Sequence, residues 1–150
     1  IEALRYFGLA KTPWHHEDEK PYKDSENVLK ILCEKGYRIG VIANQSVGTE
    51  KRLESCGLMK YIQLVVASAE EGVAKPDKRI FDIALKRAGC SPSEAVMIGD
   101  RVDNDIIPAN EMGMMTIWVR QGLGKYWTIS DESEKADFTV DNLSELLDIF

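Results

Sequence analysis

The stretch Gly99-Asp100-Arg101-Val102-Asp103-Asn104-Asp105 follows the apolar residues 95–98. A buried strand that ends in a sharp turn here would place Asp100 at the carboxyl end of a sheet, where open α/β folds bind their ligands. Asp100 and Asp105 beside one turn make an oxygen-rich site, which suits magnesium better than zinc. The competing interpretation is a helix start, with Asp100 or Asp103 as the N-cap and the other acids solvated.

Helical and extended patterns alternate along the rest of the chain. The helical pattern is clearest over 77–88, where apolar residues share one face and Pro76 and Gly89 mark the two ends. The periodicity predicts helices at 25–35, 48–55, 77–88, 103–112 and 143–150, and strands at 38–43, 61–67, 96–98, 115–119 and 138–140. Strands separated by helices at this spacing predict βαβ units and a parallel sheet, the α/β fold class.

The bulk composition is that of an ordinary globular domain with one core. The chain has 150 residues, 44% of them hydrophobic and 29% charged. A net charge of −6 without a stripe of Lys and Arg excludes nucleic acid and an anionic membrane surface as partners. The three cysteines are widely spaced and the sequence shows no targeting segment, so we expect free thiols in the cytoplasm.

Two further motifs precede the acidic stretch. They are Arg38-Ile39-Gly40-Val41-Ile42-Ala43-Asn44-Gln45 and Gly72-Val73-Ala74-Lys75-Pro76-Asp77. In this order, and with 99–105 after them, they resemble three of the four motifs of the haloacid dehalogenase (HAD) superfamily. The resemblance runs from about residue 21 to residue 150, and the ordered set is more specific than any single motif.

This resemblance implies a fold and an activity. Residues 21–150 are expected to form a three-layer, Rossmann-like, HAD-like α/β core with a parallel sheet, and residues 1–20 the end of a helical cap and a linker. The implied activity is a magnesium-dependent phosphatase (cofactor Mg2+) that acts on a small phosphorylated metabolite through an aspartyl-phosphate intermediate. The loop pattern with Asp100 and Asp105 resembles that of the metal-dependent phosphatase branch, and differs from that of the branch that cleaves carbon–halogen bonds without metal.

The resemblance also implies roles for individual residues. Asp100 matches the magnesium ligand, and Asp105 matches the second acidic position, which joins the ion or orients its waters. Lys75 matches the basic residue that pairs with nucleophile and phosphate, a role suited to a fixed point charge. Asn44 matches a catalytic, phosphate-binding position, and Gln45 is expected to bind phosphate beside it.

Both Asn44 and Lys75 have a purely structural alternative. Taken alone, Lys75 reads as a surface lysine that flanks a helix. Asn44 reads equally well as a helix N-cap after a strand. That second role is compatible with phosphate binding, because the N–H groups at a helix N-terminus attract anions.

The first motif of the superfamily, Asp-x-Asp after a hydrophobic strand, does not occur in these 150 residues. In the family it carries the nucleophile and the general acid, on a strand in the middle of the sheet. The chain opens on Ile1 in what reads as the middle of a helix. We therefore expect a missing N-terminal segment or a second chain to complete the sheet. The 150 residues alone should be inactive, with a central gap flanked by exposed apolar edges.

One further departure favours a different class of protein. Ala43 stands where the family usually has Thr or Ser, and loss of that hydroxyl donor would cost on the order of 2–4 kcal/mol in the transition state. The alternative function is a non-catalytic HAD-like binding or regulatory module that naturally lacks the nucleophile. Joint retention of Lys75, Asp100 and Asp105 favours the enzyme. A flavodoxin-like or receiver-like domain shares the sheet but leaves the Lys-Pro loop unexplained.

Overall fold

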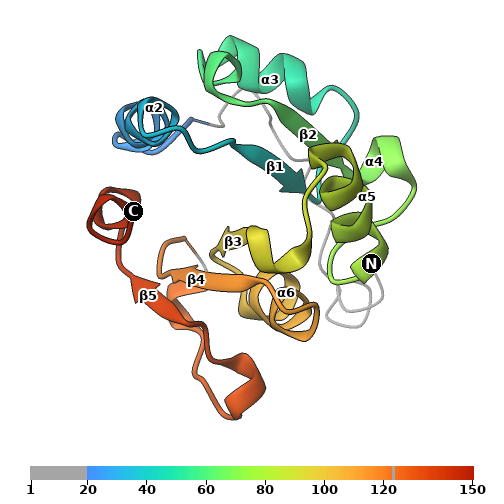
Figure 1. Cartoon of the computed structure of the whole chain (residues 1–150), viewed down its shortest axis with the longest axis vertical. Coiled ribbons are helices and arrows are strands. Elements are labelled where there is room, and N and C mark those ends of the chain that lie inside the picture. The colour runs from blue at the N-terminus through green and yellow to red at the C-terminus, as the bar shows by residue number, and fades with distance from the viewer. Residues whose placement is uncertain (1–19, 123) are drawn as a thin grey trace, which may run out of the picture.

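The computed structural model describes residues 20–122 and 124–150. The predicted end of a cap, at 1–20, lies almost wholly outside the described residues. The strands are β1 Gly40–Ala43, β2 Leu64–Ala67, β3 Val96–Gly99, β4 Met115–Val119 and β5 Phe138–Val140. The α-helices are α2 Ser25–Glu34, α3 Thr49–Ser55, α4 Ser68–Glu71, α5 Lys78–Ala88 and α6 Ile107–Glu111 (Figure 1). A π-helical turn, Val102–Ile106, leads into α6.

All strand pairs are parallel, which confirms the predicted α/β class. β1 pairs with β2, in the register Gly40 to Leu64. β3, β4 and β5 form a second sheet in that order, with Val96 beside Met115. Among the described residues, β1 and β3 are each paired on one side only, so the strands make two sheets where one continuous sheet would need another strand.

One layer of helices joins the two sheets. Val66 of β2 and Met97 of β3 belong to the same buried cluster, together with Phe81 of α5 and Ala109 of α6. Burial of one large aliphatic or aromatic side chain contributes about 1.5–3 kcal/mol. This shared core therefore holds the first sheet against the second although their strands do not pair.

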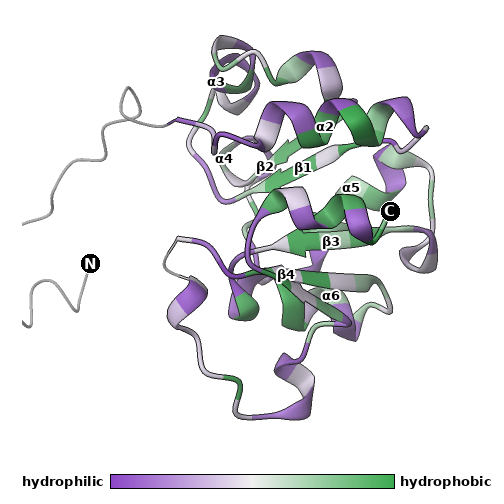
Figure 2. Ribbon diagram, turned by 90° about the vertical axis from the view of Figure 1, so that its left-hand side faces the viewer, coloured by the Kyte–Doolittle hydropathy of each residue, from purple (hydrophilic) through white to green (hydrophobic). Residues whose placement is uncertain are grey.

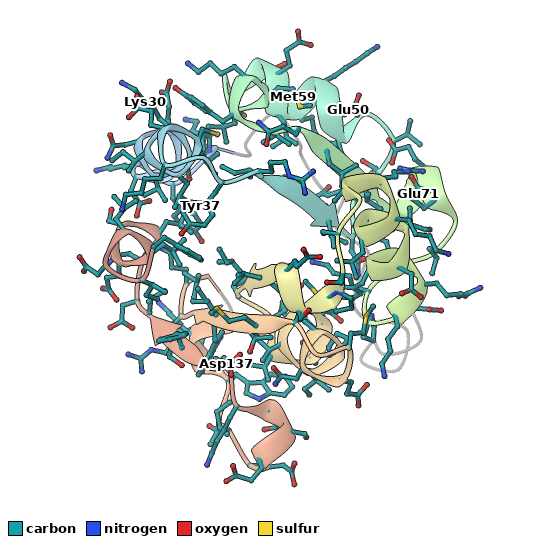
Figure 3. The ribbon with its side chains drawn as sticks, viewed as in Figure 1. Lys30, Tyr37, Glu50, Met59, Glu71 and Asp137 are labelled. Atoms are coloured by element: carbon teal, nitrogen blue, oxygen red, sulfur yellow. The ribbon has the colours of Figure 1, made fainter. Side chains whose placement is uncertain are left out.

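A second layer covers the opposite face. Val28 and Leu32 of α2 pack against Ile117 of β4 and against Leu146 in the 3₁₀-helical segment Leu143–Asp148. In Figure 2 the strands are drawn mostly in the hydrophobic colour, whereas the helices carry hydrophilic colour as well, and Figure 3 adds the side chains to the view of Figure 1. Helices on both faces of parallel strands give the three layers that the sequence predicted.

The predicted strand at 38–43 begins at Gly40, and three other predicted elements differ more clearly from the structure. The predicted helix at 103–112 is a π-helical turn followed by α6, because Pro108 lacks an N–H and its ring would clash with a carbonyl of the preceding turn. The predicted strand at 61–67 begins only at Leu64, since a 3₁₀ turn occupies Met59–Tyr61. The predicted closing helix at 143–150 is the 3₁₀ segment Leu143–Asp148.

Candidate functional site

The predicted site residues lie at the carboxyl ends of two strands. Asn44 follows β1 directly, and Asp100 follows β3 directly. Lys75 stands in the loop before α5, and Asp105 in the π-helical turn after β3. Ligand sites of open α/β folds lie at this edge.

Asn44 holds the main chain of Lys75. Its side-chain Nδ2 donates to the Lys75 carbonyl at 2.8 Å, and its Oδ1 accepts from the Lys75 N–H at 2.7 Å. The following Lys75–Pro76 peptide bond is cis. The helix N-cap interpretation of Asn44 is wrong, because α3 begins five residues later and its N-cap is Gly48. Asn44 instead fixes the loop that carries the lysine.

The Lys75 side chain reaches across to the acidic turn. Its Nζ lies 2.5 Å from Oδ1 of Asp105, and the two side chains are only 12% and 4% exposed. A charge removed from water in this way is stable only when it is paired. The interpretation of Lys75 as a surface lysine is therefore wrong.

Both oxygens of the Asp105 carboxylate are in use. Oδ1 faces Lys75, and Oδ2 accepts the Arg101 N–H at 3.0 Å. A Cβ added to Gly99 would overlap the carboxylate of Asp105. Asp105 can therefore lie this close to the strand end only because residue 99 is glycine. The π-helical turn, which is wider than an α-helical turn, contains Asp105 and positions it there.

Asp100 does not start the helical turn. The turn has Arg101 as its N-cap, without a side-chain cap hydrogen bond. Asp103, the other N-cap candidate, pairs at the surface with Arg101, whose Nε lies 2.8 Å from its Oδ1. The helix-start interpretation of these acids is therefore not supported.

The main chain of Asp100 is held from two sides. Its carbonyl accepts the indole N–H of Trp118 at 3.2 Å. A Cβ on Gly124 would overlap the same carbonyl, so only glycine fits there. Trp118 lies in the strand predicted at 115–119 and is 7% exposed, but the sequence did not reveal its contact with Asp100. The one available signal was general: a buried indole N–H needs an acceptor.

Desolvation raises the pKa of Asp100, and the nearby charge of Asp105 raises it further, while Lys75 and Arg101 oppose the shift. A carboxylate in this state gains from a bound cation. No group of three or more His, Cys, Asp and Glu side chains within 20–122 and 124–150 is arranged to hold a metal ion. Mg²⁺ is usually bound by one or two carboxylates, waters and a substrate phosphate, so Asp100 fits it as a single protein ligand.

Gln45 lies at the same edge but takes no part in the contacts among Asn44, Lys75 and Asp105. Its carbonyl accepts from the Ser68 hydroxyl at 3.2 Å and from the Ala69 N–H at 3.3 Å. The structure thus joins three predicted residues into one hydrogen-bonded chain, with Asp100 beside it and Gln45 anchored to α4.

Parallel strands between two helical layers, with charged residues at the strand ends, define an α/β protein with a ligand site at its sheet edge. The family model of haloacid dehalogenase-like hydrolases matches residues 4–119. The chain belongs to this family. In the part of the chain that the structure describes, no helix is both long and apolar enough to span a membrane.

Several relatives are named phosphatases. A glyceraldehyde 3-phosphate phosphatase of Methanopyrus kandleri is 37% identical over 131 residues, which cover 87% of this chain and 56% of the relative. A pyrimidine 5'-nucleotidase of Escherichia coli is 40% identical over 106 residues, covering 65% of this chain and 47% of that protein. The crystal structure of a HAD phosphatase from Thermococcus onnurineus superimposes with a TM-score of 0.77 at 26% identity, over 97% of this chain and 67% of that one. The chain thus spans about half the length of these curated relatives.

Proposed function

We propose that this chain forms most of the catalytic core of a magnesium-dependent phosphatase that acts on small phosphorylated metabolites. The observation that carries the proposal is the buried pair of Lys75 and Asp105, held by Asn44 beside the carboxylate of Asp100. A structural ion pair alone would not need a second carboxylate beside it at the end of β3. A site for a phosphoryl group needs both a fixed cation and an acidic metal ligand.

Each residue has a distinct role in the proposed reaction. The Lys75 ammonium pairs with oxygens of the phosphoryl group, and Asp105 keeps that ammonium in place. Asn44 sets the position of the Lys75 main chain and lies at the phosphate-binding edge with Gln45. Asp100 would hold Mg²⁺, and the positive charge of the bound ion would offset the negative charge of the phosphoryl oxygens.

The nucleophile in this proposal is an aspartate on a strand that lies outside residues 1–150 and inserts between β1 and β3. Two observations support this. No Asp-x-Asp directly follows an apolar strand in the sequence, since Asp103-Asn104-Asp105 lies in the π-helical turn after β3. The apolar residues Val41 and Ile42 of β1 and Ile98 of β3 are only half-buried, although both strands lie next to the core. A parallel strand there would cover them and would join the two sheets. Without it, residues 1–150 should have no phosphatase activity.

The substrate is proposed only as a class. The two curated relatives described above are named for a triose phosphate and for pyrimidine nucleotides, which share little beyond a phosphate ester. The proposal therefore names the phosphate ester and no other part of the substrate.

The first test is the intact mass of the protein from its native source, followed by phosphatase assays on a panel of phosphate esters with Mg²⁺ or with EDTA. We expect a mass well above 16.9 kDa, or a second co-purifying chain, and activity that EDTA abolishes. Asp100→Asn should lower kcat by about 10²–10³-fold. Asp103→Asn, in the same loop but in a surface ion pair, is the matched control and should leave the activity near that of the wild type. A single species of 16.9 kDa without activity would instead support the binding module.

A further inference from the structure

The loop between β1 and α3 is fixed at almost every main-chain oxygen. This loop, residues 44–48, begins with Asn44 and continues directly from the proposed phosphate-binding edge. Figure 1 shows that it runs from the end of β1 to α3, with α4 on the same side of the molecule. Because the loop has no ladder hydrogen bonds of its own, its shape depends on side chains from α3 and α4.

Arg52 of α3 makes the largest contribution. Its Nη1 donates to the Val47 carbonyl at 3.0 Å, and its Nη2 donates to the Ser46 carbonyl at 2.9 Å. Nη2 also donates to the hydroxyl of Thr49 at 3.0 Å, and this hydroxyl donates to the Ser46 carbonyl at 3.2 Å. One rigid, planar guanidinium thereby fixes two successive peptide groups, which the single ammonium of a lysine cannot reproduce.

α4 and its N-terminal serine fix the two ends of the same segment. The Gly48 N–H donates to Oε1 of Glu70 at 2.9 Å, and the Ser68 hydroxyl donates to the Gln45 carbonyl at 3.2 Å. In a trans peptide the C=O and N–H point in opposite directions. The contact of the Ser46 carbonyl with Arg52 therefore turns the N–H of Val47 away from α3.

We propose that Arg52 is a positioning residue for this site. It does not touch the substrate, but it sets the orientation of the peptide groups that follow Asn44, and so the placement of the phosphate at that edge. This inference rests on the proposed function. It also explains how the loop keeps a defined shape at a strand end where Ala43 supplies no hydroxyl to the site.

The test compares Arg52→Lys and Arg52→Gln with Lys51→Gln in the full-length protein. Lys51 is the neighbouring exposed basic residue of α3. Its substitution by Gln therefore removes one positive charge, as Arg52→Gln does, but leaves the two contacts of Arg52 with the loop carbonyls intact. The measurements are kcat, KM, the inhibition constant of inorganic phosphate and the hydrogen exchange rate of the amides at 45–48. A purely structural role would not separate KM from kcat.

For Arg52→Lys we expect KM and the phosphate inhibition constant to rise about tenfold with little change in kcat, and faster amide exchange confined to the loop. Arg52→Gln should behave in the same way, and Lys51→Gln should match the wild type. Added guanidinium at millimolar concentration should partly restore phosphate binding to an Arg52→Ala variant.

The inference is overturned if both Arg52 variants keep the wild-type phosphate inhibition constant while the wild type is active. It is also overturned if they lose activity only through global unfolding, with uniform exchange and no rescue by guanidinium. A wild-type protein that neither hydrolyses phosphate esters nor binds phosphate would overturn the proposed function itself, and this inference with it. The two failures are thus distinguishable.

Discussion

The ammonium of Lys75 lies 2.5 Å from the carboxylate of Asp105, 30 residues further along the chain, and neither side chain is more than 12% exposed. This contact ties the loop before α5 to the turn after β3. Lys75 lies in a segment that follows the first sheet, and Asp105 lies in a segment that follows the first strand of the second sheet. The pair that we propose for the reaction therefore also connects two segments that are far apart in the sequence.

Removal of one partner of this pair should strongly destabilise the protein. Asp105→Asn leaves the Lys75 ammonium without its counter-charge in a poorly hydrated place, at a cost of about 3–5 kcal/mol in the free energy of unfolding. Urea denaturation measures the change. The control is Asp141→Asn, which breaks the exposed pair with Arg120 and should leave the free energy almost unchanged. Equal effects of the two substitutions would show that the Lys75–Asp105 contact is not buried in solution.

Gly99 provides a purely steric test of the site. A Cβ there would overlap the Asp105 carboxylate, whereas a Cβ on Gly40 of β1 would make only ordinary contacts with Leu64, at 3.6 Å or more. Gly99→Ala should therefore cost about 1–3 kcal/mol through overpacking and should displace Asp105 from Lys75, with a large loss of activity. Gly40→Ala should leave activity and stability near wild type. If Gly99→Ala is fully active, Asp105 need not lie against the strand end.

Much of this site could be predicted from the sequence because its residues stand at strand ends. Periodicity located β1 and β3, and a residue that directly follows a parallel strand must lie at the ligand edge, as Asn44 and Asp100 do. The pairing of Asn44 with the Lys75 main chain could not be predicted, since it depends on how a loop returns to the sheet 31 residues later. The contact between Trp118 and Asp100 was hidden for a different reason: an indole in an apolar strand has the pattern of a core residue.

The hydrogen bonds between Asn44 and Lys75 give a third prediction. Asn44→Asp keeps an acceptor for the Lys75 N–H. In the wild type, the Asn44 side-chain amide donates to the Lys75 carbonyl, and the variant places a carboxylate oxygen against that carbonyl instead. We expect kcat/KM to fall about tenfold or more, because the ammonium is misplaced even though Lys75 itself is retained. Asn44→Ala, which removes both hydrogen bonds without adding repulsion, should be the milder variant in a thermal denaturation experiment. Greater stability of the Asp variant would contradict the contacts described here.

Asp100 links stability to pH and to metal. Its pKa is raised above the ordinary value of 3.8, first by desolvation and then by the charge of Asp105. Between the ordinary and the raised pKa the folded state binds more protons than the unfolded state, so the free energy of unfolding falls as the pH rises through this window. Asp100→Asn removes the titrating group, so this fall in the free energy of unfolding does not occur in the variant. Because Asp100 is exposed at the surface, water screens the effect. In EDTA, the variant should therefore be only slightly more stable than the wild type at pH 7, and this advantage should vanish at a pH below 3.8. Added Mg²⁺ should stabilise the wild type and leave the variant unchanged, because only the wild type keeps the ligand. Urea denaturation of both proteins across this pH range measures the difference, and an advantage that does not depend on pH would show that Asp100 is not desolvated.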